Sequence, residues 1–517
     1  MRINNISTSL KGAVVAAFSA TVCVFVLVAT ATAAPVQSLT IERIGGTPAA
    51  GETAAETSAY LPSAKRVYVT NSADNSVDIF SLANPASPVK VGAIDLSPYG
   101  AGPNSVAVSK LAGGRVAVAV EASPKTDPGK VVLFNRNGAY ISQVTVGAQP
   151  DMIVNNHEIQ FVVANEGEPA DDGSIDPKGT ISVINMIGPN WMFVRTAGFD
   201  HVNIPAGVRI FGPQADPSRN IEPEYVAISP TGLRAQVTLQ EANAIATVDL
   251  LRAKVISVKP LGFKDYSLPA NKLDASDRDG AVNIRNWDNL FGMYQPDAIA
   301  MYRLPGKLKP FYITANEGDA RDWDYYSEEE RVKDLPLDPV AFPAGTSGDS
   351  QLGRLNVTTS MGDTDNDGDF DELYTFGGRS VSVLDSRGSL QWDSGDALEQ
   401  YAAATDPARF NIEGLQGGFD SRSDNKGPEP EGIATGKVGN RIYAFVGNER
   451  QNTIIALDLQ AQPGKALIAG GLSTLPDDES PEGIEFIPAS ESPNRKPLLL
   501  STNEVSGTLG VFSVKRP

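Results

Sequence analysis

Hydrophobic and polar residues alternate along most of the chain in short runs, which is the period expected of half-buried β-strands. One recurring phrase is a proline, an acidic or polar residue, and then alternating apolar positions. It occurs at 102–109, 149–154, 222–229, 295–302, 428–436 and 480–487. A turn, an apolar strand ending in a polar pair, and a further strand follow each phrase. The pattern therefore predicts repeated antiparallel sheets.

The polar pairs mark how many units the chain contains. They are Asn71-Ser72, Glu121-Ala122, Asn165-Glu166, Gln240-Glu241, Asn316-Glu317, Asn448-Glu449 and Asn503-Glu504. Seven units predict an all-β protein, a seven-bladed β-propeller with loop insertions. Equivalent strand ends converge at one end of a propeller channel, so their acids would form a ring of oxygen ligands. The competing interpretation is that each pair only bonds neighbouring backbone and fixes a turn.

The spacing of the pairs locates the insertions. A blade needs roughly 40 to 50 residues, whereas 132 residues separate Asn316 from Asn448. We therefore expect a propeller over residues 60–517 with a large insertion at about 318–427. Shorter insertions are expected near 185–220 and 262–294.

The N-terminus has the features of a secretory signal. Arg2 and Lys11 precede an uncharged apolar run that ends in small residues, the order typical of a signal peptide. Residues 1–33 are predicted to be the signal peptide and 34–59 an N-terminal extension. A retained anchor is the alternative, because the run is long. Cleavage would remove Cys23, the only cysteine, and leave an exported protein without a membrane span, either periplasmic or extracellular.

The net charge of the chain restricts the classes of binding partner. The chain has 62 acidic and 43 basic residues, a net charge of −19. Such a field repels nucleic acid, and no basic stripe interrupts it. Carboxylates in this number serve solubility or hold Ca²⁺, and both interpretations stay open.

The sharpest motif is "GDTDNDGDFDELY". Its acids have the spacing of a calcium loop, with Gly368 allowing the bend. The predicted metal ligands are Asp363, Asp365, Asp367, Asp369 and Asp371. Tyr374 replaces the Glu of an EF-hand, and flanking strand patterns predict an inter-strand Ca²⁺ loop. The alternative is a solvated acidic turn. A second acidic turn, with Asp274, Asp277 and Asp279, is interpreted as an ordinary turn.

Familiar catalytic signatures are missing from the sequence. Only His157 and His201 are present, and neither lies in a motif. A serine hydrolase, a zinc protease and a P-loop NTPase are disfavoured. Arg379 is a further cationic residue, but a lone arginine is usually structural.

Carboxylates and arginines remain as catalytic candidates. Glu317 and Arg321 follow one strand end, and Glu449 and Arg450 follow another. Carboxylates could hold Ca²⁺ or act as a base, while an arginine clamps an anionic oxygen. The alternative is a charged rim of mutually neutralising pairs.

Several long stretches resemble the choice-of-anchor I family of exported β-propellers. They include "EPEYVAISPTGLRAQVTLQEANAIATVDL", "LGFKDYSLPANKLDASDRDGAVNI", "ITANEGDARDWDYYSEEERVKDLPLD" and "MGDTDNDGDFDELYTFGGRSVSVLD". The resemblance extends from about residue 60 to 517. It implies a seven-bladed propeller and export. Because bacterial members are often labelled alkaline phosphatase, it also implies calcium-dependent phosphomonoester hydrolysis.

Two functional hypotheses follow. One is a phosphoester hydrolase at an acidic channel mouth, with a small phosphoester as substrate. The other is a non-enzymatic binding or adhesion propeller with structural calcium, because animal relatives resemble cell-surface glycoproteins. The second would bind a surface ligand through the same face.

Overall fold

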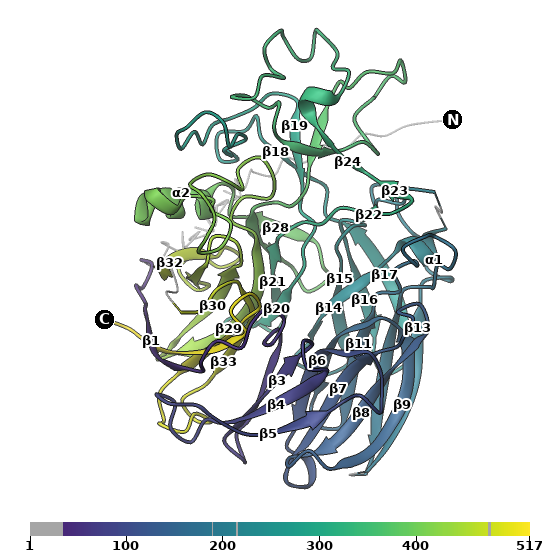
Figure 1. Cartoon of the computed structure of the whole chain (residues 1–517), viewed down its shortest axis with the longest axis vertical. Coiled ribbons are helices and arrows are strands. Elements are labelled where there is room, and N and C mark those ends of the chain that lie inside the picture. Colours follow the sequence, from purple (N-terminus) through teal and green to yellow (C-terminus); the bar gives the residue numbers. More distant parts are fainter. Residues whose placement is uncertain (1–34, 189, 214–215, 474–476) are drawn as a thin grey trace, which may run out of the picture. The chain divides into compact units, whose positions relative to one another are not determined.

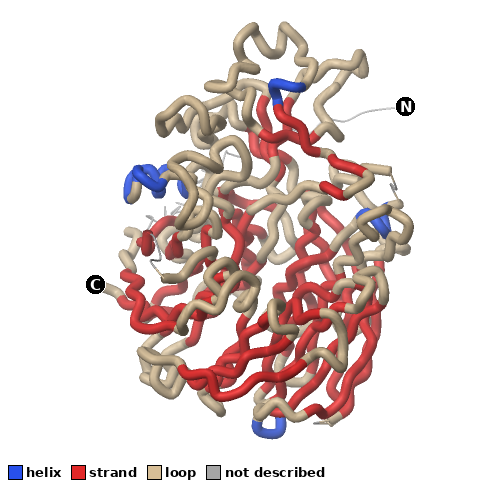
Figure 2. Tube along the Cα trace, viewed as in Figure 1, coloured by secondary structure: helices blue, strands red, loops and turns tan. Residues whose placement is uncertain are grey.

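The structure is a computed structural model that describes residues 35–188, 190–213, 216–473 and 477–517. The predicted signal peptide therefore lies outside the described residues. Residues Ala34–Pro517 form one compact unit, which consists mostly of strands (Figure 2). The helices described are α1 (Pro217–Asn220), α2 (Ala397–Thr405) and three 3₁₀ turns, Leu111–Gly113, Val332–Asp334 and Pro407–Arg409. The all-β prediction is confirmed.

Seven of the nine sheets in the described chain have four antiparallel strands. The first three follow one another directly in sequence. They are β2 (Ser58–Leu61), β3 (Arg66–Asn71), β4 (Ser76–Ser81) and β5 (Val89–Asp95); β6 (Gly102–Ser109), β7 (Arg115–Glu121), β8 (Pro128–Asn135) and β9 (Tyr140–Ala148); β10 (Pro150–Asn156), β11 (Gln160–Asn165), β12 (Thr180–Ile187) and β13 (Trp191–Gly198).

The other four sheets continue the pattern with longer connections. They are β14 (Pro223–Ile228), β15 (Arg234–Leu239), β16 (Ala244–Asp249) and β17 (Lys254–Pro260); β20 (Ile299–Tyr302), β21 (Phe311–Asn316), β27 (Ser380–Leu384) and β28 (Leu390–Asp393); β29 (Pro430–Val438), β30 (Arg441–Asn448), β31 (Thr453–Asp458) and β32 (Leu467–Ser473); β33 (Pro481–Ile487), β34 (Leu498–Asn503), β35 (Thr508–Lys515) and β1 (Thr40–Gly46).

The first strands of these sheets contact one another in a closed cycle. β2 contacts β6, and β6, β10, β14, β20, β29 and β33 follow until β33 contacts β2 again. This is the arrangement of a β-propeller (Figure 1). The segment 34–59, predicted to be an extension, contains β1, which pairs antiparallel with β35. The N-terminal strand thus completes the sheet of the C-terminal strands and covers an edge that would otherwise be unpaired.

The sequence forms these sheets because the second and third strands of each sheet have apolar side chains on both faces. Val162 and Val183 of one sheet lie in the same buried cluster as Val237 and Ala246 of the next. Comparable clusters lie between other neighbouring sheets. Burial on both faces explains the near-continuous apolar runs of the second and third strands.

The long connections form a separate layer above one end of the sheets (Figure 1). A five-stranded sheet has the order β18 (Phe263–Asp265), β19 (Leu290–Met293), β26 (Leu373–Thr375), β25 (Asn356–Thr358) and β24 (Glu329–Arg331); a two-stranded one contains β22 (Asp322–Trp323) and β23 (Tyr326–Ser327). The segment predicted as one insertion at 318–427 is divided, because β27 returns to pair with β21 and β28 pairs with β27. No helix of the described chain is long and apolar enough to cross a membrane.

Candidate functional site

The two residues of the repeated Asn-Glu pair point to different partners. The Asn165 side chain donates to the Thr180 backbone oxygen at 3.1 Å, and Asn448 donates to Thr453 Oγ1 at 2.8 Å. Asn316 and Asn503 make equivalent bonds to the strand beside them. Asn165, Asn448 and Asn503 fix hairpin turns, whereas Asn316 ties β21 to β27. The turn-fixing interpretation thus describes the first residue of those three pairs.

The glutamates that follow are held at the channel by backbone bonds. The Glu166 amide donates to the Gln149 carbonyl at 2.9 Å, and the Glu449 amide donates to the Glu429 carbonyl at 2.8 Å. Gln149 and Glu429 have positive φ, a left-handed turn directly before the repeated proline. Each strand end is therefore bonded to the start of the first strand of its own sheet.

In five of the first strands the residue after the proline lies in a β-bulge. Register shifts occur in β6, β10, β14, β29 and β33, directly after the proline. A bulge turns one side chain out of the sheet alternation. Six residues in or just before the first strands line a central cavity of about 90 Å³: Thr57, Asn104, Asp151, Asp297, Glu431 and Glu482. The proline-acid phrase thus places carboxylates inside the ring.

Burial and mutual repulsion hold the cavity carboxyls towards the neutral form. Burial, followed by the charges of Glu56 and Glu168, raises the pKa of Asp151 to about 7. Burial raises the pKa of Asp297 well above its usual range, and nearby Glu317 adds to this. Near neutral pH such a cavity favours bound protons or a bound cation.

One cluster of three glutamates spans two adjacent sheets. Glu166 follows β11, Glu224 lies in β14 and Glu241 follows β15; one carboxylate oxygen of each lies within 4.8 Å of the others. Glu224 and Glu241 are 7% and 5% exposed, and each has one oxygen without a hydrogen-bond partner. Burial and then Glu222 raise the pKa of Glu241 to about 8. Among the described residues, none of the three forms an ion pair.

A second cluster joins the next two sheets along the chain. Glu317, Glu429 and Glu449 also have carboxylate oxygens within 4.8 Å of one another. Lys426 Nζ lies 2.5 Å from Glu317 Oε1, and Arg450 Nε lies 3.2 Å from Glu449 Oε2. Glu449 Oε1 is buried without a partner. Burial, only partly offset by Arg450, raises the pKa of Glu449 to about 7.

The second cluster contains three of the four predicted catalytic residues, namely Glu317, Glu449 and Arg450. Arg321 lies elsewhere. Its guanidinium is 2.6 Å from Glu222 Oε2, donates to the Asn220 carbonyl at 2.7 Å, and lies 4.4 Å above the Phe211 ring. Because Arg321 is 3% exposed, its donors are engaged in holding the loop before β14.

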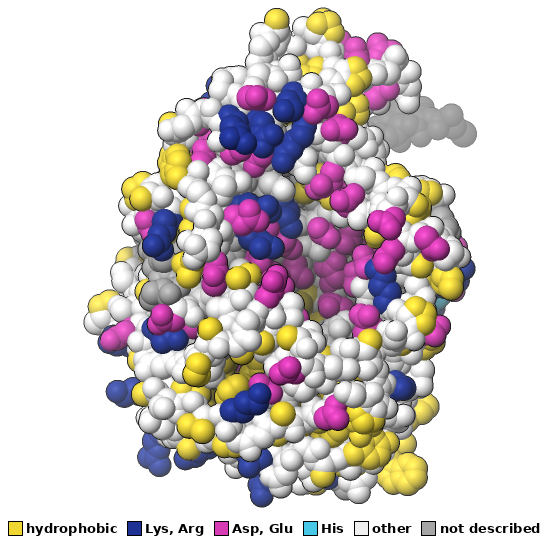
Figure 3. Space-filling view, in the orientation of Figure 1, with side chains coloured by type: hydrophobic (Ala, Val, Ile, Leu, Met, Phe, Trp, Pro, Cys, Tyr) yellow, Lys and Arg dark blue, Asp and Glu magenta, His cyan; other side chains and the backbone are white. Residues whose placement is uncertain are grey.

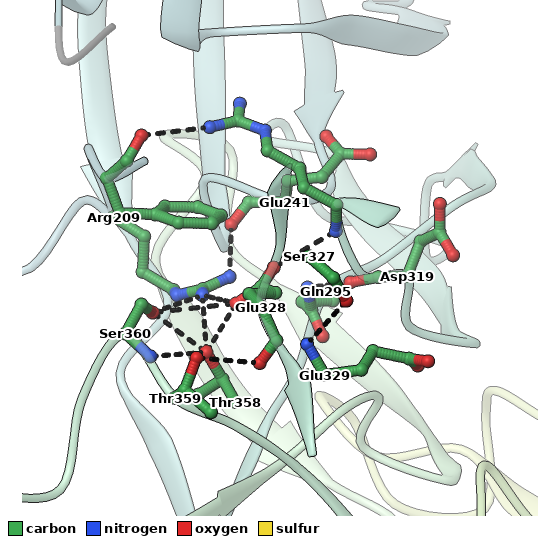
Figure 4. A network of polar contacts seen from close by, with 12 residues as sticks. Arg209, Glu241, Gln295, Asp319, Ser327, Glu328, Glu329, Thr358, Thr359 and Ser360 are labelled. Carbon is green, nitrogen blue, oxygen red and sulfur yellow. Dashed lines mark hydrogen bonds and ion pairs between the residues drawn. The ribbon is translucent and has the colours of Figure 1, made fainter. Parts of the chain in front are cut away.

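A buried polar network fastens the insertion to the first cluster. Arg209 donates to the Glu241 carbonyl at 2.8 Å and to Glu328 Oε2 at 2.5 Å. Thr358 Oγ1 donates to the same Glu328 oxygen, and Ser360 accepts from Arg209 at 3.0 Å (Figure 4). The sequence offered no signal for this network, since Arg209 and Glu328 are 119 residues apart.

The acidic residues of this region surround a hollow on one face of the molecule (Figure 3). Burial raises the pKa of Asp319 to about 8, although Lys426 opposes the rise. The sequence predicted a ring of strand-end acids. It did not single out Glu224, Glu429 or Lys426, although the proline-acid phrase was the signal for Glu224.

The predicted calcium loop lies between β25 and β26. Asp363, Asp365 and Asp371 bring carboxylate oxygens within 4.8 Å of one another, while Asp369 groups with Asp338 and Asp371. Asp367 accepts from the Asp369 amide at 3.2 Å and belongs to neither group. The loop is an inter-strand turn, as expected from its flanking strands, and its oxygens divide between two groups.

The choice-of-anchor I domain model matches residues 56–462, most of the chain. The protein belongs to the choice-of-anchor I family. Domains of this family are typical of exported and cell-surface proteins.

Two curated proteins are similar in sequence to this choice-of-anchor I protein. It is 34% identical to Gigasin-3a of Magallana gigas over 191 residues, which are 32% of this chain and 66% of that protein. It is 32% identical to the mesenchyme-specific cell surface glycoprotein of Strongylocentrotus purpuratus over 338 residues, 57% of this chain and 41% of that protein. The chain thus matches less than two thirds of the length of either relative.

The solved structures that are similar in backbone arrangement have low sequence identity to this chain. Hydrazine synthase of Kuenenia stuttgartiensis is 12% identical, with a TM-score of 0.47 over 89% of this chain and 96% of that one. The Cps50 (Swd1) β-propeller domain of Myceliophteria thermophila is 10% identical, with a TM-score of 0.46 over 92% of this chain and 99% of that one.

Proposed function

We propose that this exported choice-of-anchor I protein is a seven-bladed propeller that hydrolyses phosphomonoesters with the help of Ca²⁺ at its acidic channel mouth. The observation that carries the proposal is the cluster of Glu317, Glu429 and Glu449 beside Lys426 and Arg450. Carboxylates suit a hard cation, and cationic side chains suit phosphoryl oxygens. The seven four-stranded sheets are the blades, and the two smaller sheets are insertions.

The donor set fits a calcium ion. The three carboxylates present oxygens within 4.8 Å of one another, and Glu449 has a buried oxygen that no protein group bonds. When bound, Ca²⁺ polarises a phosphoryl oxygen and lowers the pKa of a nearby water. An acidic face repels an anionic substrate, so neutralisation of these carboxylates precedes phosphate binding.

The side chains around this cluster have distinct roles. Glu317 would hold the cation, and Glu449 would act either as a second ligand or as the base that takes the proton of the attacking water. Arg450, whose side chain is 31% exposed, binds a phosphoryl oxygen together with Lys426. Arg321 acts indirectly, because it holds Glu222 and the Asn220 backbone in place.

Calcium also binds the loop with Asp363, Asp365, Asp367, Asp369 and Asp371. There its role is structural, because the loop connects β25 to β26 within the insertion. A cation shared through Asp371 would join both carboxylate groups of the loop.

The test is hydrolysis of p-nitrophenyl phosphate by the mature protein from pH 6 to 10, with Ca²⁺ or with a chelator. We expect turnover in the presence of Ca²⁺ that is lost in the chelator. Glu317→Ala and Arg450→Ala should each lower turnover by about a hundredfold. Glu42→Gln is the control, since this exposed residue pairs with Lys515 on outer strands. No turnover under any condition, from a folded protein, would reject the hydrolase.

A binding function is the second candidate. One curated relative is named as a cell surface glycoprotein, and the same acidic mouth offers Ca²⁺-mediated contacts to a surface ligand. Calcium that raises the melting temperature of a protein without phosphoester turnover would favour this alternative.

A further inference from the structure

Three aspartates from two distant segments meet in the insertion layer, away from both glutamate clusters. Asp274 and Asp279 lie in the loop between β18 and β19, and Asp420 lies between α2 and β29. One carboxylate oxygen of each is within 4.8 Å of the others. The turn interpreted from sequence as ordinary is thus completed by an acid 146 residues further on.

The cluster is buried and lacks a countercharge. Asp274 and Asp420 are each 1% exposed, and Asp420 Oδ2 has no hydrogen-bond partner. Among the described residues no lysine or arginine forms an ion pair with any of the three. Burial raises the pKa of Asp420 to about 8, and the neighbouring Asp274 and Asp279 add to the rise.

Local hydrogen bonds orient the carboxylates without filling the space between them. Ser423 donates to Asp420 Oδ1 at 2.5 Å, and the Asn283 side chain donates to Asp279 Oδ2 at 2.9 Å. The Asn283 amide also donates to Asp274 Oδ2. These bonds leave Asp420 Oδ2 inside a protein interior without any donor, which is unfavourable unless a proton or cation binds it.

Arg379, the nearby cation, is already neutralised. Its guanidinium bonds Glu399 Oε1 at 2.8 Å, the Asp274 carbonyl at 2.7 Å and the Ser423 carbonyl at 2.8 Å. Arg379 therefore pairs with Glu399 and braces the backbone of both segments. This leaves the negative charge of three aspartates uncompensated.

We propose that Asp274, Asp279 and Asp420 bind a calcium ion that joins the β18–β19 loop to the segment before β29. All three donors are oxygens, which suits a hard cation better than Zn²⁺. The three carboxylate oxygens lie within 4.8 Å of one another, which is close enough for one Ca²⁺ with Ca²⁺–oxygen distances of about 2.3–2.6 Å to contact all of them.

The joined segment also reaches the channel mouth. Six residues after Asp420, Lys426 contacts Glu317 at 2.5 Å, and Arg422 contacts Glu429 at 2.5 Å. A cation at Asp420 would thus hold the backbone that supplies two cationic groups to the mouth. The site itself stands on the aspartates alone and does not depend on the proposed hydrolase activity.

The test counts bound calcium in the full mature protein by native mass spectrometry and by calorimetric titration with CaCl₂. Asp420→Asn and Asp279→Asn should each bind one calcium fewer than the wild type, or bind it at least tenfold more weakly. Glu413→Gln is the control in the same segment, because Glu413 is half exposed and makes only a 3.6 Å contact with Arg422. It should bind as the wild type does.

Two results would overturn the site. One is an unchanged calcium count and affinity in both folded variants, and the other is a wild type that binds no calcium at the millimolar concentrations typical of extracellular modules. Asp279 is only partly buried, so Asp279→Asn keeps the test decisive if Asp420→Asn fails to fold. Limited proteolysis supplies a second readout, with faster cleavage of the wild-type insertion expected after chelation.

Discussion

Substituting Glu241 by glutamine should make the metal-free protein less sensitive to alkaline pH. The Glu241 carboxyl is 5% exposed, and its pKa is raised to about 8 from the ordinary 4.5 by burial and by Glu222. Its folded form therefore holds a proton that the unfolded form releases. The contribution of this group to the free energy of unfolding is fully present below pH 4.5 and is lost as the pH rises towards 8.

The size of the effect follows from linkage. Between the two pKa values the folded state binds about one proton more, so stability falls by about 1.4 kcal/mol per pH unit. From pH 6.0 to 7.5 this is about 2 kcal/mol. With the average unfolding entropy per residue, it corresponds to roughly 2 °C in melting temperature for a chain of this length.

The assay is calorimetric unfolding of wild type and Glu241→Gln in chelator at pH 6.0 and 7.5. Glutamine has the same shape and no charge, and the backbone bond from Arg209 to residue 241 stays. We expect the variant to lose about 2 °C less than the wild type over this interval, while Glu42→Gln behaves as the wild type. Saturating Ca²⁺ should remove much of the wild-type loss and less of the variant's. Equal losses in the variant and wild type would refute the assignment of buried charge to Glu241.

Two further predictions concern the contacts that hold the site. Glu328→Gln leaves Arg209 buried without its countercharge, which should cost about 3–5 kcal/mol; increased proteolysis of the insertion would reveal it, and unchanged proteolysis would contradict it. Asn448→Ala removes the bond to Thr453 and should cost about 1–2 kcal/mol, visible as a lower melting temperature with calcium stoichiometry retained.

The repeat was the predictable part of the fold. Proline-acid phrases and Asn-Glu pairs recur at strand ends, so their periodicity alone indicated antiparallel sheets and converging acids. The divided role of the pair was not predictable, because Asn165 and Glu166 are adjacent polar residues and the repeat does not show which of them faces the neighbouring strand. The hydrogen bond from Asn165 to Thr180 fixes the orientation of Asn165. This bond exists only once the hairpin has formed.

Contacts across the insertions could not be read from the sequence. Arg321 was placed beside Glu317 because they are four residues apart, yet its partner Glu222 is 99 residues away. Lys426 reaches Glu317 over 109 residues. Such pairings depend on how long loops pack over the sheets, and loops carry no periodic signal that fixes their position.

The two glutamate clusters are built from similar positions at the strand ends, but only one of them has positively charged partners. In each, strand-end glutamates of two adjacent sheets meet an acid beside the proline of the second sheet: Glu166 and Glu241 meet Glu224, and Glu317 and Glu449 meet Glu429. Acids at equivalent strand ends therefore concentrate like charge between these two pairs of neighbouring sheets.

The presence or absence of neighbouring positive charges then decides what each cluster can bind. Lys426 and Arg450 contact the second cluster, so a cation there leaves positive groups free to meet an anion. The first cluster has no ion-pair partner among the described residues, and Arg321 nearby is engaged with Glu222. Its unpartnered oxygens must hold protons or a metal. The proposed chemistry on an anionic substrate is therefore assigned to the second cluster, and the first cluster is the one whose proposed metal binding would change stability.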